Sequence, residues 1–245
     1  MRYLILSDIH GNWEALAAVA AQARGCYDTI LCCGDLVGYC ADPNPVVKWV
    51  RANVHLVVRG NHDKVCAGLE DLEWFNPVAR MAAAWTLNAL SPANLDYLRN
   101  LRKGPAAVES FQVLHGSPLD EDDYLMSTFE VEQIQSYLEK QVSFFGHTHL
   151  QGGFLCDWQG VRRIGGALPN GDTVLELDPD AWYLINPGSV GQPRDGDPRA
   201  AYALYDPAAR VVEYHRAAYD IAAAQRKIRA AGLPEILALR LETGD

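Results

Sequence analysis

Residues 3–12 read YLILSDIHGN, in which a run of four apolar residues is followed by a serine and an aspartate. Such a run predicts a short strand buried on both faces, which is typical of parallel sheets. Asn12 lies where it can cap a following helix that ends near Gly25. The alternation continues with a strand over residues 29–33, a helix over 43–53 and a strand over 55–58. This order is that of parallel βαβ units, so an α/β fold is predicted.

The rest of the chain divides into a helix-rich segment and a β-rich half. Residues 64–105 are predicted to form a helical insert, in which Ser91 and Pro92 start one helix. The elements predicted after it are strands over 106–114 and 142–145, a helix over 129–138, an antiparallel pair over 201–205 and 210–215, and a last helix over 220–231. The tail is expected to pack on the surface. Because no linker or repeat is found, we predict a single domain over residues 1–245.

Five polar turns follow predicted strands and carry most of the histidines of the chain. These turns are Asp8-Ile9-His10, Gly34-Asp35, Gly60-Asn61-His62-Asp63, His115-Gly116 and Gly146-His147-Thr148-His149. The carboxyl ends of the strands in an open α/β sheet meet at one crevice, so these side chains are expected to converge. One such turn alone is most often a cap or a bend, but five in succession favour a common site.

The residue types in these turns suit transition-metal ions. Imidazole and carboxylate ligands together favour manganese, iron, cobalt, nickel or zinc, whereas sets made only of oxygen favour magnesium or calcium. The ligands are too many for one tetrahedral ion and fit two divalent ions that share a carboxylate. Such ions would attract an anionic phosphoryl group into a chain whose formal net charge is −10. They can also stabilise the attacking and leaving oxygens of an in-line displacement.

The complete set of turns resembles the motifs of the calcineurin-like metallophosphoesterases, and residues 186–194, NPGSVGQPR, resemble the small prokaryotic phosphoesterase branch of that superfamily. The resemblance implies an α/β/β/α sandwich and a role for each position. The first metal would be held by Asp8, His10 and His149, the second by Asn61, His115 and His147, and Asp35 would bridge them. His62 would be a general acid that protonates the leaving alkoxide while a metal-bridging hydroxide attacks phosphorus.

The second motif departs from that of the protein-phosphatase and dinucleoside-polyphosphatase branches, which continues as Gly-Asp-x-x-Asp-Arg-Gly. Gly38 and Tyr39 stand where that aspartate and arginine would be. The missing aspartate would have oriented His62, and the missing arginine would have held phosphate. The departure therefore disfavours a serine/threonine protein phosphatase, which stays the nearest alternative among enzymes.

Four residues are candidates for contact with the substrate. Arg59 precedes Gly60, as in the Arg-Gly-Asn-His form of related enzymes, while Arg194 and Arg199 flank a turn-rich loop from which an arginine could clamp phosphate. Asn12 would cap a helix whose N-terminus points toward the same crevice. Each also has a plainer interpretation as a surface charge, a solvated loop residue or a helix cap.

Two further groups are expected to be structural. The acidic run Asp120–Asp123 lacks the spacing of a calcium loop and is interpreted as a solvated loop, which would repel long polyanions if it lay near the crevice. Trp74, Phe75, Trp85 and Tyr97 are expected to form the core of the insert rather than a platform on which bases stack. The insert itself could form one wall of the substrate pocket.

The composition narrows the class of protein. The 31 acidic and 21 basic residues argue against bulk binding of a nucleic-acid polymer or an anionic membrane. The six cysteines show no disulfide framework, and no signal or membrane-spanning segment is evident, so a cytoplasmic protein is expected. We therefore predict a dinuclear phosphoesterase for a small phosphodiester or phosphomonoester. A metal-binding scaffold of the same fold is the alternative from another class, and a homo-oligomer is left open.

Overall fold

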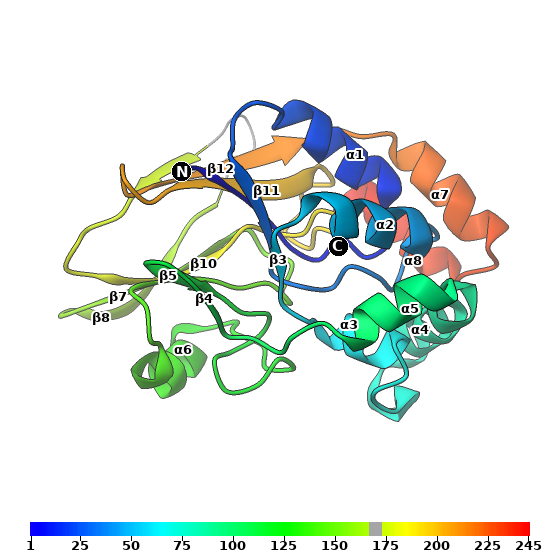
Figure 1. The fold of residues 1–245 in the computed structure, drawn as a ribbon, viewed down its shortest axis with the longest axis horizontal. Coiled ribbons are helices and arrows are strands. Elements are labelled where there is room, and N and C mark those ends of the chain that lie inside the picture. Colours follow the sequence, from blue (N-terminus) through cyan, green and yellow to red (C-terminus); the bar gives the residue numbers. More distant parts are fainter. Residues whose placement is uncertain (167–172) are drawn as a thin grey trace.

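The computed structural model describes residues 1–166 and 173–245 and contains two six-stranded mixed sheets (Figure 1). The first sheet has the strand order β3 (Leu56–Val57), β2 (Thr29–Cys32), β1 (Tyr3–Leu6), β11 (Ala200–Asp206), β12 (Val211–Ala217), β9 (Thr173–Glu176). The second has the order β4 (Ala106–Val108), β5 (Phe111–Val113), β6 (Val142–Phe144), β10 (Trp182–Asn186), β7 (Gly152–Asp157), β8 (Gly160–Ile164). The parallel strands β1, β2 and β3 confirm the predicted βαβ units.

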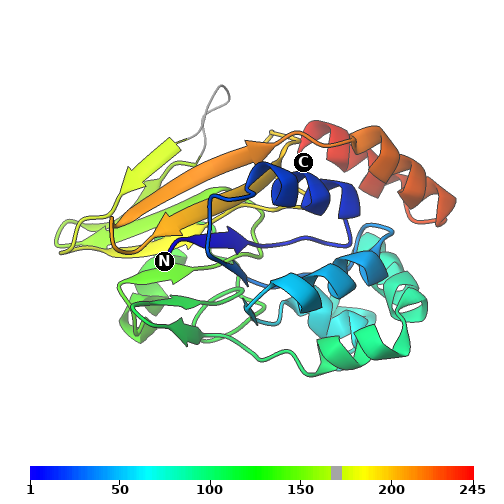
Figure 2. The ribbon, with the colours of Figure 1, turned by 45° about the horizontal axis from the view of Figure 1, so that its top comes forward.

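Helices cover both outer faces of the two sheets. They are α1 (Trp13–Gln22), α2 (Pro43–Asn53), α3 (Asn61–Cys66), α4 (Pro77–Ala89), α5 (Pro92–Arg99), α6 (Thr128–Ile134), α7 (Ile221–Ala230) and α8 (Glu235–Thr243), with 3-10 turns at Leu72–Trp74 and Gln135–Tyr137. Apolar side chains of α1 and α2 pack on the first sheet, and those of α6 pack on the second. The predicted α/β/β/α sandwich is confirmed, and Figure 2 shows most of the helices gathered toward one end of the strands.

Strand β1 shows why the opening apolar run has no polar alternation. Tyr3 and Ile5 point into the core between the two sheets, whereas Leu4 and Leu6 point into the core beneath α1 and α2. Successive side chains of a strand face opposite sides, so a strand between two apolar layers must be apolar throughout. The strand ends at Leu6, and the polar turn begins with Ser7 and Asp8.

The structure differs from the predicted elements in four places. Residues 106–114 form a hairpin of β4 and β5, because Glu109 takes a positive φ of 50° and turns the chain. The helix predicted over 129–138 begins at Thr128 and gives way to a 3-10 turn after Ile134. The strands after Gly152 are divided between both sheets, and β10 runs parallel to β6. The tail forms the helix α8, which packs on α7 through buried apolar side chains.

The insert places α3, α4 and α5 side by side (Figure 1). The core residues Ala79 and Ala82 of α4 lie in one buried cluster with Leu237 of α8.

Among the described residues, no helix combines the length and the apolar character needed to cross a membrane.

Candidate metal centre

Seven predicted ligands come together where the strands of both sheets end. On the first sheet, Asp8 and His10 follow β1, Asp35 follows β2 and Asn61 follows β3. On the second sheet, His115 follows β5, and His147 and His149 follow β6. The turns were predicted to meet in the crevice of one open sheet, whereas the site lies across the junction of the two sheets. Hydrogen bonds from His147 N to the Asp8 carboxylate, at 3.1 and 3.2 Å, join the turns of the two sheets.

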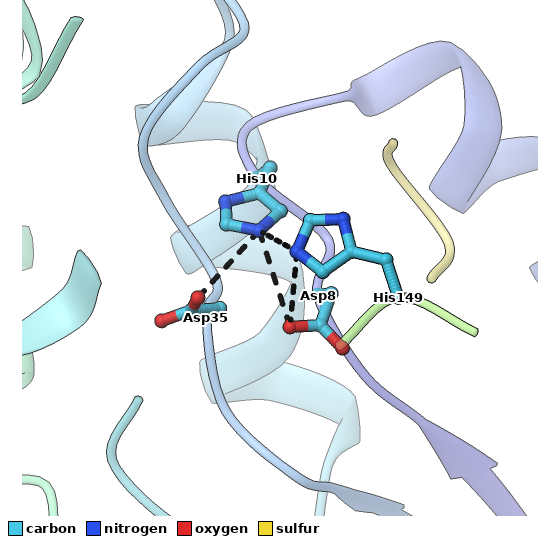
Figure 3. A group of neighbouring side chains, drawn as sticks. All are labelled: Asp8, His10, Asp35 and His149. Carbon is cyan, nitrogen blue, oxygen red and sulfur yellow. Dashed lines mark hydrogen bonds and ion pairs between the residues drawn. The ribbon is translucent and has the colours of Figure 1, made fainter. Parts of the chain in front are cut away.

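The ligand atoms form two groups that share Asp35. One group is Asp8, His10, Asp35 and His149, and the other is Asp35, His115 and His147; within each group the ligand atoms lie within 4.8 Å of one another. Figure 3 shows the four side chains of the first group pointing toward one another. Asn61 Oδ1 adds an oxygen to the second group, 3.3 Å from His115 Nε2.

Asp35 Oδ2 lies between the two groups. This buried oxygen is 3.5 Å from His10 Nε2 and 3.4 Å from His115 Nε2, yet it makes no hydrogen bond with any described residue. Asp35 Oδ1, in contrast, accepts a hydrogen bond from His62 N at 2.8 Å. A buried carboxylate oxygen needs a cation or a donor to compensate its charge, and here the partners are the His10 and His115 rings or a metal ion that these rings would share with Asp35. Its position therefore fits a metal ligand common to the two groups.

The two histidines of the first group direct unprotonated Nε2 atoms toward each other. His10 Nδ1 donates to Val37 O at 3.1 Å, and His149 Nδ1 donates to Gln192 O at 2.5 Å. Because carbonyl oxygens only accept, both rings carry their proton on Nδ1 and a lone pair on Nε2. The two Nε2 atoms lie only 3.0 Å apart, and two facing lone pairs at this distance fit a shared cation.

The protonation of these groups follows from burial and from Asp35. Burial lowers the pKa of His10 to about 4 and that of His147 to about 3, which leaves both imidazoles neutral and able to bind a metal. Burial acts in the same direction on His115, but the Asp35 carboxylate outweighs it and raises the pKa of His115 to about 10. A proton on His115 therefore balances Asp35 when no metal is bound.

The backbone of the site is strained at most of the ligands. Positive φ angles between 50° and 66° occur at Asp8, His10, Asp35, His147 and His149. Residues other than glycine adopt this left-handed conformation at a cost of about 1 kcal/mol or more each, and such strain gathers at functional sites. The strain brings ligands from short turns onto a common centre.

The loop of residues 186–194 holds the first group in place. Ser189 Oγ donates to Asp8 O at 2.7 Å, Gly191 N donates to the same oxygen at 2.9 Å, and Gln192 O accepts from His149. A Cβ on Gly191 would lie 1.9 Å from Ile9 O, so only glycine permits this close approach. The motif at residues 186–194 marked this loop in the sequence, but its contacts with the ligands were not predicted, because backbone carbonyl partners have no signature in a sequence.

The His62 ring lies 4.8 Å from the ring of His10, and its Nδ1 has no hydrogen-bond partner among the described residues. Its buried ring packs between those of Tyr39 and Phe75, at centroid distances of 4.4 and 4.6 Å, and burial lowers its pKa well below the usual range. Asp63 does not orient it, because its carboxylate accepts from Leu36 N at 2.8 Å and from Gly60 N at 3.1 Å. Aromatic packing therefore takes the place of the aspartate absent at Gly38.

The predicted substrate contacts lie in different surroundings. Asn12 uses both polar atoms internally, since Oδ1 accepts from Ala15 N at 3.1 Å and Nδ2 donates to Gly191 O at 2.9 Å. Arg59 forms an ion pair of 2.7 Å with Glu121. Arg194 reaches the site, because its guanidinium lies 5.7 Å from the centre of the Tyr39 ring. Burial lowers the pKa of His149 well below its usual value, and the charge of Arg194 acts in the same direction.

The remaining candidates lie outside the ligand cluster. Arg199 pairs with Asp197 at 2.6 Å. In the acidic run Asp120–Asp123, the three aspartates are exposed as expected of a solvated loop, whereas Glu121 is only 5% exposed, so the expectation is wrong for this residue. Ion pairs of Glu121 with Arg59, at 2.7 Å, and with Lys64, at 3.5 Å, compensate the buried charge.

The aromatic residues of the insert are not all part of its core. Phe75, Trp85 and Tyr97 pack against buried clusters as predicted. Trp74 is 83% exposed, so the prediction is wrong for this residue. It belongs to a 3-10 turn in which no side chain is buried.

The comparisons with known proteins agree with this geometry. Residues 1–210 match the calcineurin-like phosphoesterase superfamily domain. The chain belongs to this superfamily. A metallophosphoesterase from Sphaerobacter thermophilus has a similar structure, with a TM-score of 0.86 and 38% identity over 100% of this chain and 99% of that one.

Two further proteins are similar over nearly their whole length. An uncharacterised protein of Methanocaldococcus jannaschii is 37% identical over 98% of this chain and 97% of its own. A hypothetical protein from Pyrococcus horikoshii shares the fold at a TM-score of 0.78, with 19% identity over 100% of this chain and 98% of that one. The superfamily assignment indicates hydrolysis of phosphoesters, and the Asp and His groups provide a candidate metal-binding site.

Proposed function

We propose that this protein is a dinuclear metal-dependent phosphoesterase that hydrolyses a small phosphodiester or phosphomonoester. The observation that carries the proposal is the position of Asp35 Oδ2 between the two ligand groups. Asp8, His10 and His149 would hold one divalent transition-metal ion, and Asn61, His115 and His147 the other. When bound, the two ions supply positive charge for the phosphoryl oxygens and an activated water.

The other residues at the site have roles in binding and proton transfer. Arg194 would contact the phosphoryl group, because its Nε is buried without a partner among the described residues and its guanidinium lies near the metal centre. His62 would donate a proton to the leaving oxygen. Because burial favours the neutral ring, a bound phosphate is needed to favour its protonation.

The six unpaired cysteines support a reducing compartment, such as the cytoplasm.

The test is hydrolysis of bis-(p-nitrophenyl) phosphate and of p-nitrophenyl phosphate by metal-stripped protein refilled with manganese, iron, cobalt, nickel, zinc or magnesium. We expect turnover that depends on the metal, and its loss in Asp35→Asn, which keeps the shape of the side chain but removes its charge. Asp157→Asn, at an ion pair on the exposed β7–β8 hairpin, is the control and should keep full turnover. Full turnover in Asp35→Asn would refute the proposal, and metal-loaded protein inactive on both esters would favour a scaffold.

A further inference from the structure

A cavity of about 440 Å³ opens beside the second ligand group. Asn61, His62 and His147 form its inner end, whereas Asp8, His10 and His149 do not line it. The cavity therefore extends from the metal centre on the side of the proposed proton donor. Sites for small molecules commonly enclose roughly 300–1,000 Å³, so this space suits one modest organic group.

Four aromatic rings form much of the wall of this cavity. They belong to Tyr39, Trp74, Phe75 and Tyr124. Three are fixed on the site, since Tyr39 and Phe75 pack on His62, and Tyr124 lies on His147 at a centroid distance of 3.8 Å. Trp74, in contrast, is 83% exposed and offers its indole at the cavity. A flat apolar group that entered the cavity would cover an indole that is now in water.

The charges at the cavity disfavour an anionic group there. Glu70 and Asp122 line it, and none of the described lining residues is a lysine or an arginine. The nearby Lys64 forms ion pairs with both carboxylates, since its Nζ lies 2.5 Å from Glu70 and 2.6 Å from Asp122. The same Nζ lies 3.5 Å from Glu121. The charge of Lys64 is thus already balanced by carboxylates, and the proposed function assigns the nearby Arg194 to the phosphoryl group of the ester. A second phosphate in the cavity would therefore find no lining cation of its own.

We propose that this cavity binds the organic part of the leaving group and selects a flat, uncharged aromatic group, such as an aryl ring or a nucleobase, over an aliphatic or polyphosphate group. The inference rests on the proposed function, because it places the leaving group beside His62. Its specificity-determining residue is Trp74, which would stack on the aromatic ring.

A pair of phosphomonoesters with primary alcohols tests the selection by hydrolysis. 2-Phenylethyl phosphate and n-butyl phosphate differ in the aromatic ring but have leaving groups of similar basicity. We expect wild-type kcat/KM to favour the phenylethyl ester, and Trp74→Ala to lower the ratio of the two values about five- to tenfold. Trp158→Ala, at an equally exposed tryptophan on the distant β7–β8 hairpin, should leave the ratio unchanged. A ratio unaltered in Trp74→Ala would overturn the inference.

A binding measurement separates this inference from the proposed function. Adenosine carries a nucleobase but no phosphate, so its binding requires no catalysis. We expect adenosine to quench tryptophan fluorescence saturably in wild type and in Trp158→Ala, and the quenching to be lost in Trp74→Ala. If adenosine quenches the fluorescence in this way but no ester is hydrolysed, the aromatic site is supported and the proposed activity is refuted. If the protein hydrolyses esters but adenosine causes no quenching that depends on Trp74, the aromatic site is refuted and the proposed activity is not.

Discussion

The imidazole of His62 packs against the α-carbon of Gly38, because a Cβ built on this glycine would lie 2.4 Å from His62 Nδ1. Gly38 also has a positive φ of 94°. The glycine thus leaves the space into which the ring fits, at the position where related branches carry an aspartate. His62 is held by shape and by aromatic neighbours rather than by a charge.

Substitution of Gly38 by alanine should therefore displace His62. We expect Gly38→Ala to reduce kcat about a hundredfold on 2-phenylethyl phosphate, because the alkoxide that leaves from this ester must be protonated, while metal content is retained. Gly160→Ala is the matched control, since Gly160 has a similar φ of 109° but no atom within 4 Å of the built Cβ. Equal losses in the two variants would show that backbone strain, not His62, is responsible.

Asp63 should act on stability and not on the orientation of His62. Its buried carboxylate accepts hydrogen bonds from Leu36 N and Gly60 N, which belong to the turns that carry Asp35 and Asn61. Asp63→Ala would leave these donors without a partner, so we expect the free energy of unfolding to fall by about 2–4 kcal/mol. Urea denaturation of the metal-free protein measures it. Asp220→Ala, at the exposed cap of α7, should cost about 1 kcal/mol, and a smaller loss in Asp63→Ala would contradict this role.

Ser189 should control how firmly the first metal is held. Its hydroxyl donates to Asp8 O and accepts from Gln192 N at 2.8 Å, and Gln192 O in turn holds His149. We expect Ser189→Ala to weaken retention of metal about ten- to a hundredfold, measured by competition with a chelator. The exposed Ser136→Ala serves as the control. Unchanged retention in Ser189→Ala would show that the 186–194 loop is not needed to hold the ligands.

Metal binding should release protons at neutral pH. Asp35 raises the pKa of His115 to about 10 against the effect of burial, so this ring is protonated in the metal-free protein at pH 7. A metal must displace that proton, and its apparent affinity should therefore rise as the pH rises from 6 to 8. Calorimetry in buffers of different ionisation enthalpy measures the number of protons released. An affinity that did not change with pH would contradict a proton on His115.

Much of the fold could be predicted because local patterns agree with the final packing. The run Tyr3–Leu6 and the alternation that follows indicate a buried strand and parallel βαβ units, and Asn12 and Ser91 cap helices as their types predict. The division of the later strands between two sheets could not be predicted, since the pairing of β10 with β6 depends on residues about 40 positions apart. Trp74 was misassigned because apolar character alone does not distinguish a core residue from the wall of a pocket.

The candidate site was easier to predict than its support. Asp8, His10 and the other ligands are chemically distinctive residues at strand ends. Backbone carbonyls such as those of Val37 and Gln192 have no signature in a sequence, although they set the tautomers of His10 and His149. The role of aromatic packing around His62 likewise depends on the insert, whose position relative to the site is set only in the folded chain.

The most direct measurement of the central claim is the number of metal ions held by each chain. Metal-stripped protein would be refilled with Mn²⁺, separated from free ions by gel filtration and analysed by plasma mass spectrometry. Because Asp35 Oδ2 lies between two ligand groups, we predict two ions in wild type and in Asp157→Asn, and fewer than two in Asp35→Asn. One ion or none in folded wild-type protein, or two ions retained in Asp35→Asn, would contradict a dinuclear centre bridged by Asp35.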